Sequence, residues 1–219
     1  NCENSTQQPQ DIVFISYDEI NADLNYEKLK KRFPNAMRIH GVKGNVIAYK
    51  AAAKLSTTPW YYAVFPKTVI DDNFNFDTNP DYLETPGHYI FNATNAVTDN
   101  CYGHGGVKMY HVKTTTEIEN WGFDFTMSSP VTSIPVNSCF IEPADDYEAW
   151  RTAFREALKL RNQTDIESRY RLHKWLTVGN GPYGEASKKG AAAALEYNGD
   201  LKLANSWEWL REQFESSIS

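Results

Sequence analysis

The N-terminal half of the chain alternates short apolar runs with amphipathic stretches. Runs of apolar, β-branched and aromatic residues predict buried strands at 11–17 and 60–65, with a shorter strand at 36–40 between them. Helices are predicted at 25–32, which ends before Phe33-Pro34, and at the alanine-rich stretch 46–55. This order is typical of a parallel, doubly wound sheet, in which ligands bind at the carboxyl ends of the strands.

The pattern changes after Phe76, where short strands separated by loops are predicted at 88–93, 107–112 and 139–142. Four helical stretches follow, at 147–160, 167–175, 184–197 and 206–214. We therefore predict an α/β protein with a Rossmann-like parallel sheet in the N-terminal half and a mixed sheet with helices in the C-terminal half.

The length of 219 residues suits one domain, which we expect over residues 11–219. The polar stretch 1–10 is expected to be a flexible tail of a trimmed or processed product, since the chain opens on Asn1. No apolar run approaches the roughly 20 residues that cross a bilayer, so we expect a soluble protein without a membrane partner. Three cysteines without paired spacing favour a reducing, cytoplasmic location.

The net charge of −6 argues against a protein that coats nucleic acid over its whole surface. Residues 151–189 depart from this average, because they carry nine Lys and Arg residues against four Asp and Glu residues. Two interpretations stay open for this basic stretch. It forms either a solvated helix surface or a phosphate-binding face.

Several nucleotide-binding and catalytic motifs are missing from the sequence. It contains no GxxxxGK[ST] phosphate loop, no GxGxxG that opens a helix, and no HExxH, GxSxG or kinase signature. Phosphate-loop ATPases and dinucleotide-dependent enzymes therefore lack support.

Several segments resemble a known group of proteins. IVFISYDE at 12–19, RIHGVKG at 38–44, AAAKL at 51–55 and the strand at 61–65 resemble the nucleotide-binding half of GT-A glycosyltransferases. The resemblance is closer to glycosyltransferase-like proteins of large tailed bacteriophages, and it continues through YGHGG at 102–106, AWRTAFREALKL at 149–160 and WLTVG at 175–179. It implies a GT-A-like fold that transfers a sugar from a nucleotide-sugar to a hydroxyl, with a modified base in phage DNA as the suggested acceptor.

One position departs from the GT-A pattern. These enzymes usually place Asp-x-Asp after the strand before the donor site, where the carboxylates hold Mn²⁺ or Mg²⁺ against the diphosphate. Phe65-Pro66-Lys67 stands there instead, so no metal site or cofactor is predicted. The Lys67 ammonium would either neutralise the diphosphate directly or lie on the surface of a non-functional site. The nearby Asp71 and Asp72 could supply carboxylates, but they fall beyond the strand end and are expected in a turn.

The resemblance assigns donor binding to residues at the strand ends. Tyr17 is a candidate for stacking on the base, and His40 ends the second predicted strand. Asp18 and Glu19 would accept hydrogen bonds from the ribose or base, or else form a turn. Lys43 would contact phosphate or be an exposed loop lysine.

The resemblance places the acceptor near the loop that contains Tyr102. Gly103 and Gly105 would let a sugar approach the backbone. His104 is a candidate base for the acceptor hydroxyl, because imidazole titrates near neutral pH, and Asp124 is the competing candidate.

Arg151 and Arg155 are the candidates for gripping phosphate of the donor or of DNA. They follow Trp150 and Phe154, whose spacing puts both aromatic rings on one helix face and predicts that they belong to the core. The alternative to an enzyme is a non-catalytic module of glycosyltransferase fold that binds nucleotide, nucleic acid or a protein partner.

Overall fold

The computed structural model of the protein describes residues 9–84, 86–103, 105–119, 125 and 129–219. The chain divides into two compact units. The first, Asn1–Thr94 with Cys101–Ile141, contains the strands and is called the sheet unit. The second, Asn95–Asn100 with Glu142–Ser219, is called the helical unit. The expectation of a single domain over 11–219 stays a prediction.

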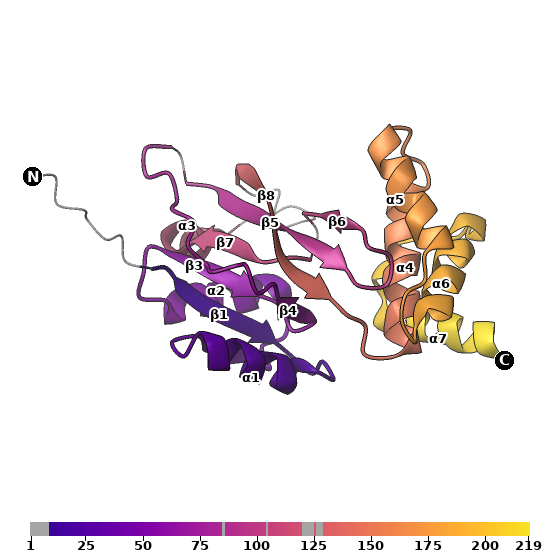
Figure 1. Cartoon of the computed structure of the whole chain (residues 1–219), viewed down its shortest axis with the longest axis horizontal. Coiled ribbons are helices and arrows are strands. Elements are labelled where there is room, and N and C mark those ends of the chain that lie inside the picture. The colour runs from indigo at the N-terminus through magenta and orange to yellow at the C-terminus, as the bar shows by residue number, and fades with distance from the viewer. Residues whose placement is uncertain (1–8, 85, 104, 120–124, 126–128) are drawn as a thin grey trace, which may run out of the picture. The chain divides into compact units, whose positions relative to one another are not determined.

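The sheet unit is built on one mixed sheet with the strand order β2-β1-β3-β7-β5-β8-β4, and β6 pairs with β5 beside this path (Figure 1). The strands are β1 Asp11–Ser16, β2 Met37–His40, β3 Trp60–Val64, β4 Thr68–Ile70, β5 His88–Asn95, β6 Cys101–Tyr102, β7 Lys108–His111 and β8 Val131–Ile141. β1 is parallel to both β2 and β3, whereas β7 is antiparallel to β3. The predicted α/β class, with a parallel N-terminal half and a mixed remainder, is confirmed.

Helices α1 (Ala22–Arg32) and α2 (Asn45–Leu55) bury alternate side chains of the parallel strands. Phe14 lies in one core cluster with Leu29 of α1, while Val13 lies in another with Ala52 of α2. Successive side chains of a strand point to opposite faces of the sheet, so α1 and α2 cover opposite faces.

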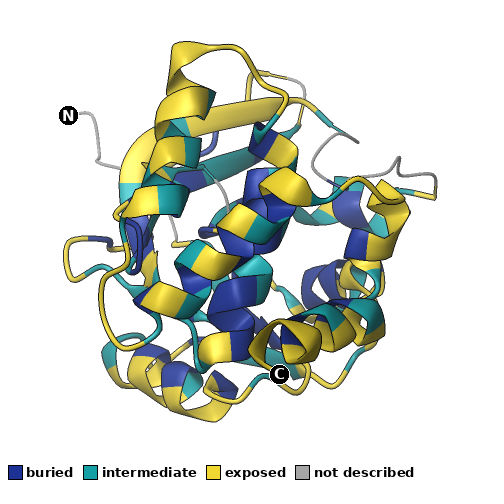
Figure 2. Ribbon diagram, turned by 90° about the vertical axis from the view of Figure 1, so that its right-hand side faces the viewer, coloured by how far each residue is buried: buried dark blue, intermediate teal, exposed yellow. Residues whose placement is uncertain are grey.

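The helical unit has its own core. Its helices are α4 Asp146–Leu160, α5 Ile166–Thr177, α6 Gly184–Glu196, the 3₁₀ helix η2 Leu201–Asn205 and α7 Trp207–Ile218. Their buried residues form stripes beside exposed ones (Figure 2). The α4 and α6 backbones approach closely at Gly190, where an added Cβ would lie 2.2 Å from the Trp150 carbonyl oxygen. None of the helices among the described residues has the length and apolarity that a membrane crossing requires.

Several elements differ from the predictions, and for three of them the local physical reason is clear. β8 begins at Val131, whereas the sequence predicted a strand only from 139. The earlier start was missed because most of the first six residues are exposed and show no buried alternation. β4 has only three residues, too few for a periodic signal. The short helix α3 (Val112–Glu117) contains three consecutive threonines, which are weak helix formers, and its first turn is capped by the His111 side chain.

Candidate functional site

The three parallel strands end side by side in the sheet unit. Ser16 at the end of β1 pairs with His40 at the end of β2, and Phe14 pairs with Val64 at the end of β3. We call the strand ends and the residues after them, 16–19, 38–43 and 65–67, the strand-end site. Asp18, His40 and Lys67 all belong to it, so the structure brings these three predicted donor residues to one edge of the sheet.

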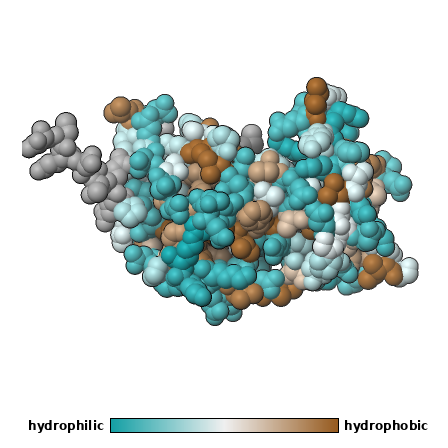
Figure 3. All heavy atoms as spheres, viewed as in Figure 1, coloured by the Kyte–Doolittle hydropathy of each residue, from teal (hydrophilic) through white to brown (hydrophobic). Residues whose placement is uncertain are grey.

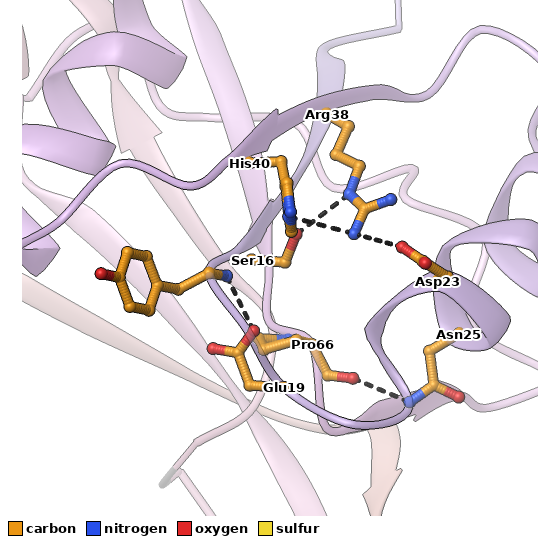
Figure 4. A network of polar contacts seen from close by, with 8 residues as sticks. Ser16, Glu19, Asp23, Asn25, Arg38, His40 and Pro66 are labelled. Atoms are coloured by element: carbon orange, nitrogen blue, oxygen red, sulfur yellow. Dashed lines mark hydrogen bonds and ion pairs between the residues drawn. The ribbon is translucent and has the colours of Figure 1, made fainter.

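A hydrogen-bond network joins β1 and β2 in the strand-end site (Figure 4). The Ser16 hydroxyl lies 2.8 Å from His40 Nδ1, and Arg38 Nε donates to Ser16 Oγ at 3.0 Å. Arg38 Nη2 lies 3.2 Å from the same His40 Nδ1. A guanidinium can only donate, so Nδ1 is the acceptor and the neutral ring carries its proton on Nε2. The exposed His40 therefore presents a fixed N–H donor.

Arg38 is held in place from both sides. Its Nη2 forms an ion pair with Asp23 Oδ1 of α1 at 2.8 Å (Figure 4). Its guanidinium carbon lies 5.6 Å from the centre of the Phe14 ring and 5.2 Å from that of Tyr26. Only 19% of its side chain is exposed, against 84% for Asp23. Arg38 is thus a fixed support for Ser16 and His40.

The turn after β1 is shaped by Glu19, whose Oε2 accepts a hydrogen bond from the Tyr17 backbone N–H at 2.7 Å. The structure therefore shows the turn-forming role that was left open for Glu19. Tyr17 is 45% exposed and Asp18 is also exposed, so both side chains are available to a ligand. Their roles in donor binding stay predictions.

The segment after β3 is anchored by α1. The buried Asn25 donates from Nδ2 to the Pro66 carbonyl oxygen at 2.7 Å (Figure 4), which fixes the backbone next to the half-buried Lys67. A second ammonium group lies at this strand end, because Lys108 Nζ is 5.6 Å from the centre of the Phe65 ring. Lys108 begins β7 and pairs with Ala63 of β3.

The loop after β2 leads into α2. The Gly41 N–H donates to the Ser16 carbonyl oxygen at 3.0 Å, and Gly41 and Gly44 have φ values of 77° and 96°, which favour glycine. Gly44 gives α2 no side-chain cap, and the first turn of α2 has no acidic residue. The exposed Lys43 therefore precedes a helix end with positive electrostatic character.

Sequence reasoning missed Ser16, Arg38, Asn25 and Lys108. Arg38 carried a usable signal, because it lies two residues before His40 on the same strand and so points to the same face. Lys108 carried none, since its position depends on the non-local pairing of β7 with β3.

The glycines of the 102–106 loop have a packing explanation within the sheet unit. An added Cβ at Gly103 would lie 3.0 Å from Cδ1 of Ile90, and one at Gly105 would lie 3.0 Å from Cδ1 of Ile141. Gly105 also has a φ of 64°. Approach of a sugar to Gly103, Gly105 and Tyr102 stays a prediction. His104 and Asp124 lie outside the described residues, and their roles as bases stay predictions.

The residues after β3 do not fit a metal site. Asp71 accepts hydrogen bonds from the Asn73 N–H and from Asn137 Nδ2, both at 2.8 Å, and these bonds lower the pKa of its carboxyl group. Arg32 donates to the carbonyl oxygens of Asp71 and Asp72 at 2.8 Å. Both aspartates lie in a turn, as expected. No group of three His, Cys, Asp or Glu residues with metal-binding placement occurs in the described part of the chain.

Arg151 and Arg155 lie on α4 of the helical unit. Trp150 and Phe154 are each 2% exposed and stack with ring centres 5.1 Å apart, so their predicted core position is confirmed. Elsewhere in the basic stretch Arg171 pairs with Glu167, and Lys188 pairs with Glu185 at 2.6 Å. These pairs support a solvated surface for part of the stretch. Phosphate binding by Arg151 and Arg155 stays a prediction.

No protein-family model matches the chain, and no curated protein matches it either. Among solved structures, it is similar to a glycosyltransferase involved in the glycosylation of the major capsid of PBCV-1, with 12% identity and a TM-score of 0.28. That match covers 48% of this chain and 61% of the other, so the chain spans less than two thirds of that protein.

Two further structures cover more of the chain. A mannosyltransferase from Pyrobaculum calidifontis in complex with GDP-Man and Mn²⁺ is 15% identical, with a TM-score of 0.42, over 97% of this chain and 82% of that one. A putative glucose-1-phosphate thymidylyltransferase from Bacillus anthracis in complex with a sucrose is 10% identical, with a TM-score of 0.38, over 89% and 80%. These TM-scores are low, so the α/β class rests on the strand order and pairing of this chain.

Proposed function

We propose that the sheet unit binds a nucleotide-sugar at the strand-end site and transfers the sugar to a hydroxyl group. One observation carries this proposal: Ser16, His40 and Arg38 form a fixed polar network where three adjacent parallel strands end. In the order β2-β1-β3, the chain passes from β1 to β2 on one side of β1 and then to β3 on the other, so a topological switch point lies between β1 and β3. Open α/β sheets bind nucleotides outside the carboxyl ends of strands at such points.

The nucleoside would contact residues that follow β1 and end β2. The exposed Tyr17 ring offers a stacking surface for the base, and the His40 Nε2–H donates to an acceptor on the base or ribose. The exposed Asp18 carboxylate accepts a hydrogen bond from a ribose hydroxyl. Arg38 takes no direct part, because it is engaged with Ser16, His40 and Asp23.

The diphosphate would lie between two positive features. Lys43 and the uncapped N-terminus of α2 attract phosphate oxygens through charge and backbone N–H groups. On the other side of β1, Lys67 supplies an ammonium where GT-A enzymes usually place metal-binding carboxylates.

In the transfer step, the acceptor oxygen attacks the anomeric carbon of the sugar. The bond from that carbon to the diphosphate oxygen breaks, and the diphosphate leaves with the electron pair. The acceptor proton passes to a base, for which His104 and Asp124 are our candidates. Lys43 and Lys67 stabilise the charge that develops on the leaving diphosphate. A modified base in phage DNA is the acceptor that the resemblance suggests.

A second candidate function is nucleotide binding without transfer. The observation that favours it is Phe65-Pro66-Lys67 in the place of Asp-x-Asp. Both functions require the strand-end site to bind a nucleotide, and they differ only in turnover.

Calorimetric titration with a panel of nucleotide-sugars and their nucleoside diphosphates tests the shared requirement. Lys43→Gln should weaken diphosphate affinity by about three- to tenfold, which corresponds to about 0.7–1.4 kcal/mol. Lys54→Gln is the matched control, because Lys54 is exposed in the last turn of the same helix, about 14 Å along its axis. It should leave affinity unchanged.

Chromatography of the reaction mixture then separates the two functions. Release of nucleoside diphosphate in the presence of an acceptor hydroxyl supports transfer, whereas tight binding without release supports the second candidate. A panel that yields no binding, or equal weakening by Lys43→Gln and Lys54→Gln, contradicts the strand-end site itself.

A further inference from the structure

Two rows of side chains meet in the helical unit. Tyr147, Arg151 and Arg155 occupy positions i, i+4 and i+8 of α4 and therefore share one helix face. Trp207 and Arg211 occupy positions i and i+4 of α7. The Tyr147 hydroxyl donates to the Trp207 carbonyl oxygen at 3.3 Å, which joins the two rows. We call these five residues the arginine-aromatic cluster.

Guanidinium groups and aromatic rings alternate in this cluster. The guanidinium carbon of Arg151 is 4.1 Å from the centre of the Trp207 ring, and that of Arg155 is 5.4 Å from the same ring. Arg211 lies 3.8 Å from the centre of the Tyr147 ring, and Arg151 lies 5.1 Å from it. Three positive charges are therefore gathered around two rings that they share.

The cluster carries three positive charges, and the acidic side chain that partly offsets one of them is Glu156, next to Arg155. Within the described ranges, no ion pair joins Arg151, Arg155 or Arg211 to an acidic side chain, unlike Arg171 and Lys188 in the same unit. Burial lowers the pKa of Arg155, and repulsion by Arg151 lowers it further, although Glu156 opposes these effects. Bringing like charges together is costly, so an anion that neutralises them would bind favourably.

The surface of the cluster is accessible to a ligand. Trp207 is 51% exposed, Arg211 is exposed, and Arg151 and Arg155 are partly exposed. Of the acidic residues of α7, Glu208 and Glu215 lie three and four positions from Arg211 and are its neighbours on the helix surface, but no ion pair joins either of them to Arg211 among the described residues. Exposed apolar side chains also occur in small groups among hydrophilic ones on the face that Figure 3 shows.

We infer that the arginine-aromatic cluster binds single-stranded nucleic acid. Guanidinium groups pair with phosphates through directed hydrogen bonds, and their planes stack on bases. An exposed tryptophan adds a stacking surface that any base can use. A duplex hides the faces of its bases, so it would gain only the phosphate contacts. This inference does not depend on nucleotide-sugar binding at the strand-end site, and either can fail alone.

Fluorescence anisotropy with a labelled single-stranded oligothymidine of about 20 nucleotides tests the inference. Substitution of Arg151, Arg155 and Arg211 together by Gln should weaken binding at least about tenfold at low salt. The slope of log K against log salt should become shallower by about 2, since each phosphate contact on single strands contributes about 0.7. Trp207→Ala should weaken binding by about tenfold through lost stacking.

The matched control removes the same number of charges from exposed positions of the helical unit, by changing Arg169, Lys189 and Lys202 to Gln. It should weaken binding less than about twofold.

Circular dichroism verifies folding of each variant. If the triple arginine variant does not fold, Arg211→Gln alone replaces it, because this residue is exposed, and should weaken binding about threefold. Tyr170→Ala, at another exposed ring beside a cation, is the control for Trp207.

Three results would overturn the inference. One is the lack of oligothymidine binding at low salt, and another is equal weakening by the cluster variants and their controls. The third is tighter binding of a duplex of equal length than of the single strand, because it would mean that phosphate contacts alone account for the affinity.

Discussion

Substitution of Arg38 by Gln tests whether the strand-end network is a rigid support. The side chain donates to Ser16 and His40 and pairs with Asp23, and its guanidinium lies over two aromatic rings. Hydrogen bonds from a charged donor contribute about 1.5–3 kcal/mol each, and a cation over a ring about 0.5–1 kcal/mol. Desolvation of the guanidinium, which is 19% exposed, offsets part of this sum. We therefore expect a loss of about 2 kcal/mol in the free energy of unfolding.

Urea denaturation followed by circular dichroism measures this loss, and Asp23→Asn is the matched control. Asp23 is 84% exposed, so its ion pair with Arg38 should contribute less than about 1 kcal/mol. We therefore expect Arg38→Gln to lower the free energy of unfolding more than Asp23→Asn does, although the two residues form one ion pair. Arg38→Gln should also weaken nucleotide binding, because His40 loses the contact that fixes its proton on Nε2.

The reasoning would be refuted by either of two outcomes. If Asp23→Asn costs as much as Arg38→Gln, the exposed ion pair stabilises the site and the network does not. If Arg38→Gln costs less than about 0.5 kcal/mol, the hydrogen bonds to Ser16 and His40 contribute nothing measurable beyond their desolvation.

Three further predictions concern metal, pH and thiol chemistry. Addition of EDTA should change nucleotide-sugar affinity by less than about twofold, because we propose that the Lys67 ammonium takes the place of a metal ion; a large loss in the titration would contradict this. Burial, and repulsion by Lys113, lower the pKa of His111 in the folded state, so its contribution to stability is present above its unfolded pKa and lost as pH falls through the folded value. The urea midpoint of the wild type should therefore fall more between pH 7.5 and 5.5 than that of His111→Asn. These pH values bracket the usual histidine pKa of about 6.5. Equal falls in the two proteins would count against a lowered pKa of His111. Burial raises the pKa of Cys139 to about 11, so iodoacetamide should label the exposed Cys101 and leave Cys139 unlabelled by mass spectrometry until the protein unfolds; labelling of Cys139 in the folded protein would contradict its burial.

Local sequence patterns were sufficient for the parallel half of the sheet. β1 and β3 are buried runs of apolar residues, and α2 is rich in alanine, so periodicity and propensity agree with the tertiary structure. The edge at which the strand ends meet then followed from the parallel order of β1, β2 and β3. The position of the candidate site could therefore be predicted before its side-chain partners.

The partners depend on contacts between segments that are distant in sequence. Asn25 reaches the Pro66 carbonyl because α1 packs on the sheet beside the end of β3, and no local pattern encodes that contact. β4 and the first half of β8 were missed because they are short or exposed, so neither carries a buried periodicity.

The arginine-aromatic cluster shows how much of a site a helical pattern can encode. Spacing along α4 correctly separated the buried Trp150 and Phe154 from the row that carries Arg151 and Arg155. The same spacing could not indicate that Trp207, 52 residues after Arg155, would place its ring beside both guanidinium groups. A helix pattern specifies which residues share a face, whereas the partner of that face depends on how the helices pack. Charges that look solvated in sequence therefore become a binding surface only when a second helix contributes the aromatic rings.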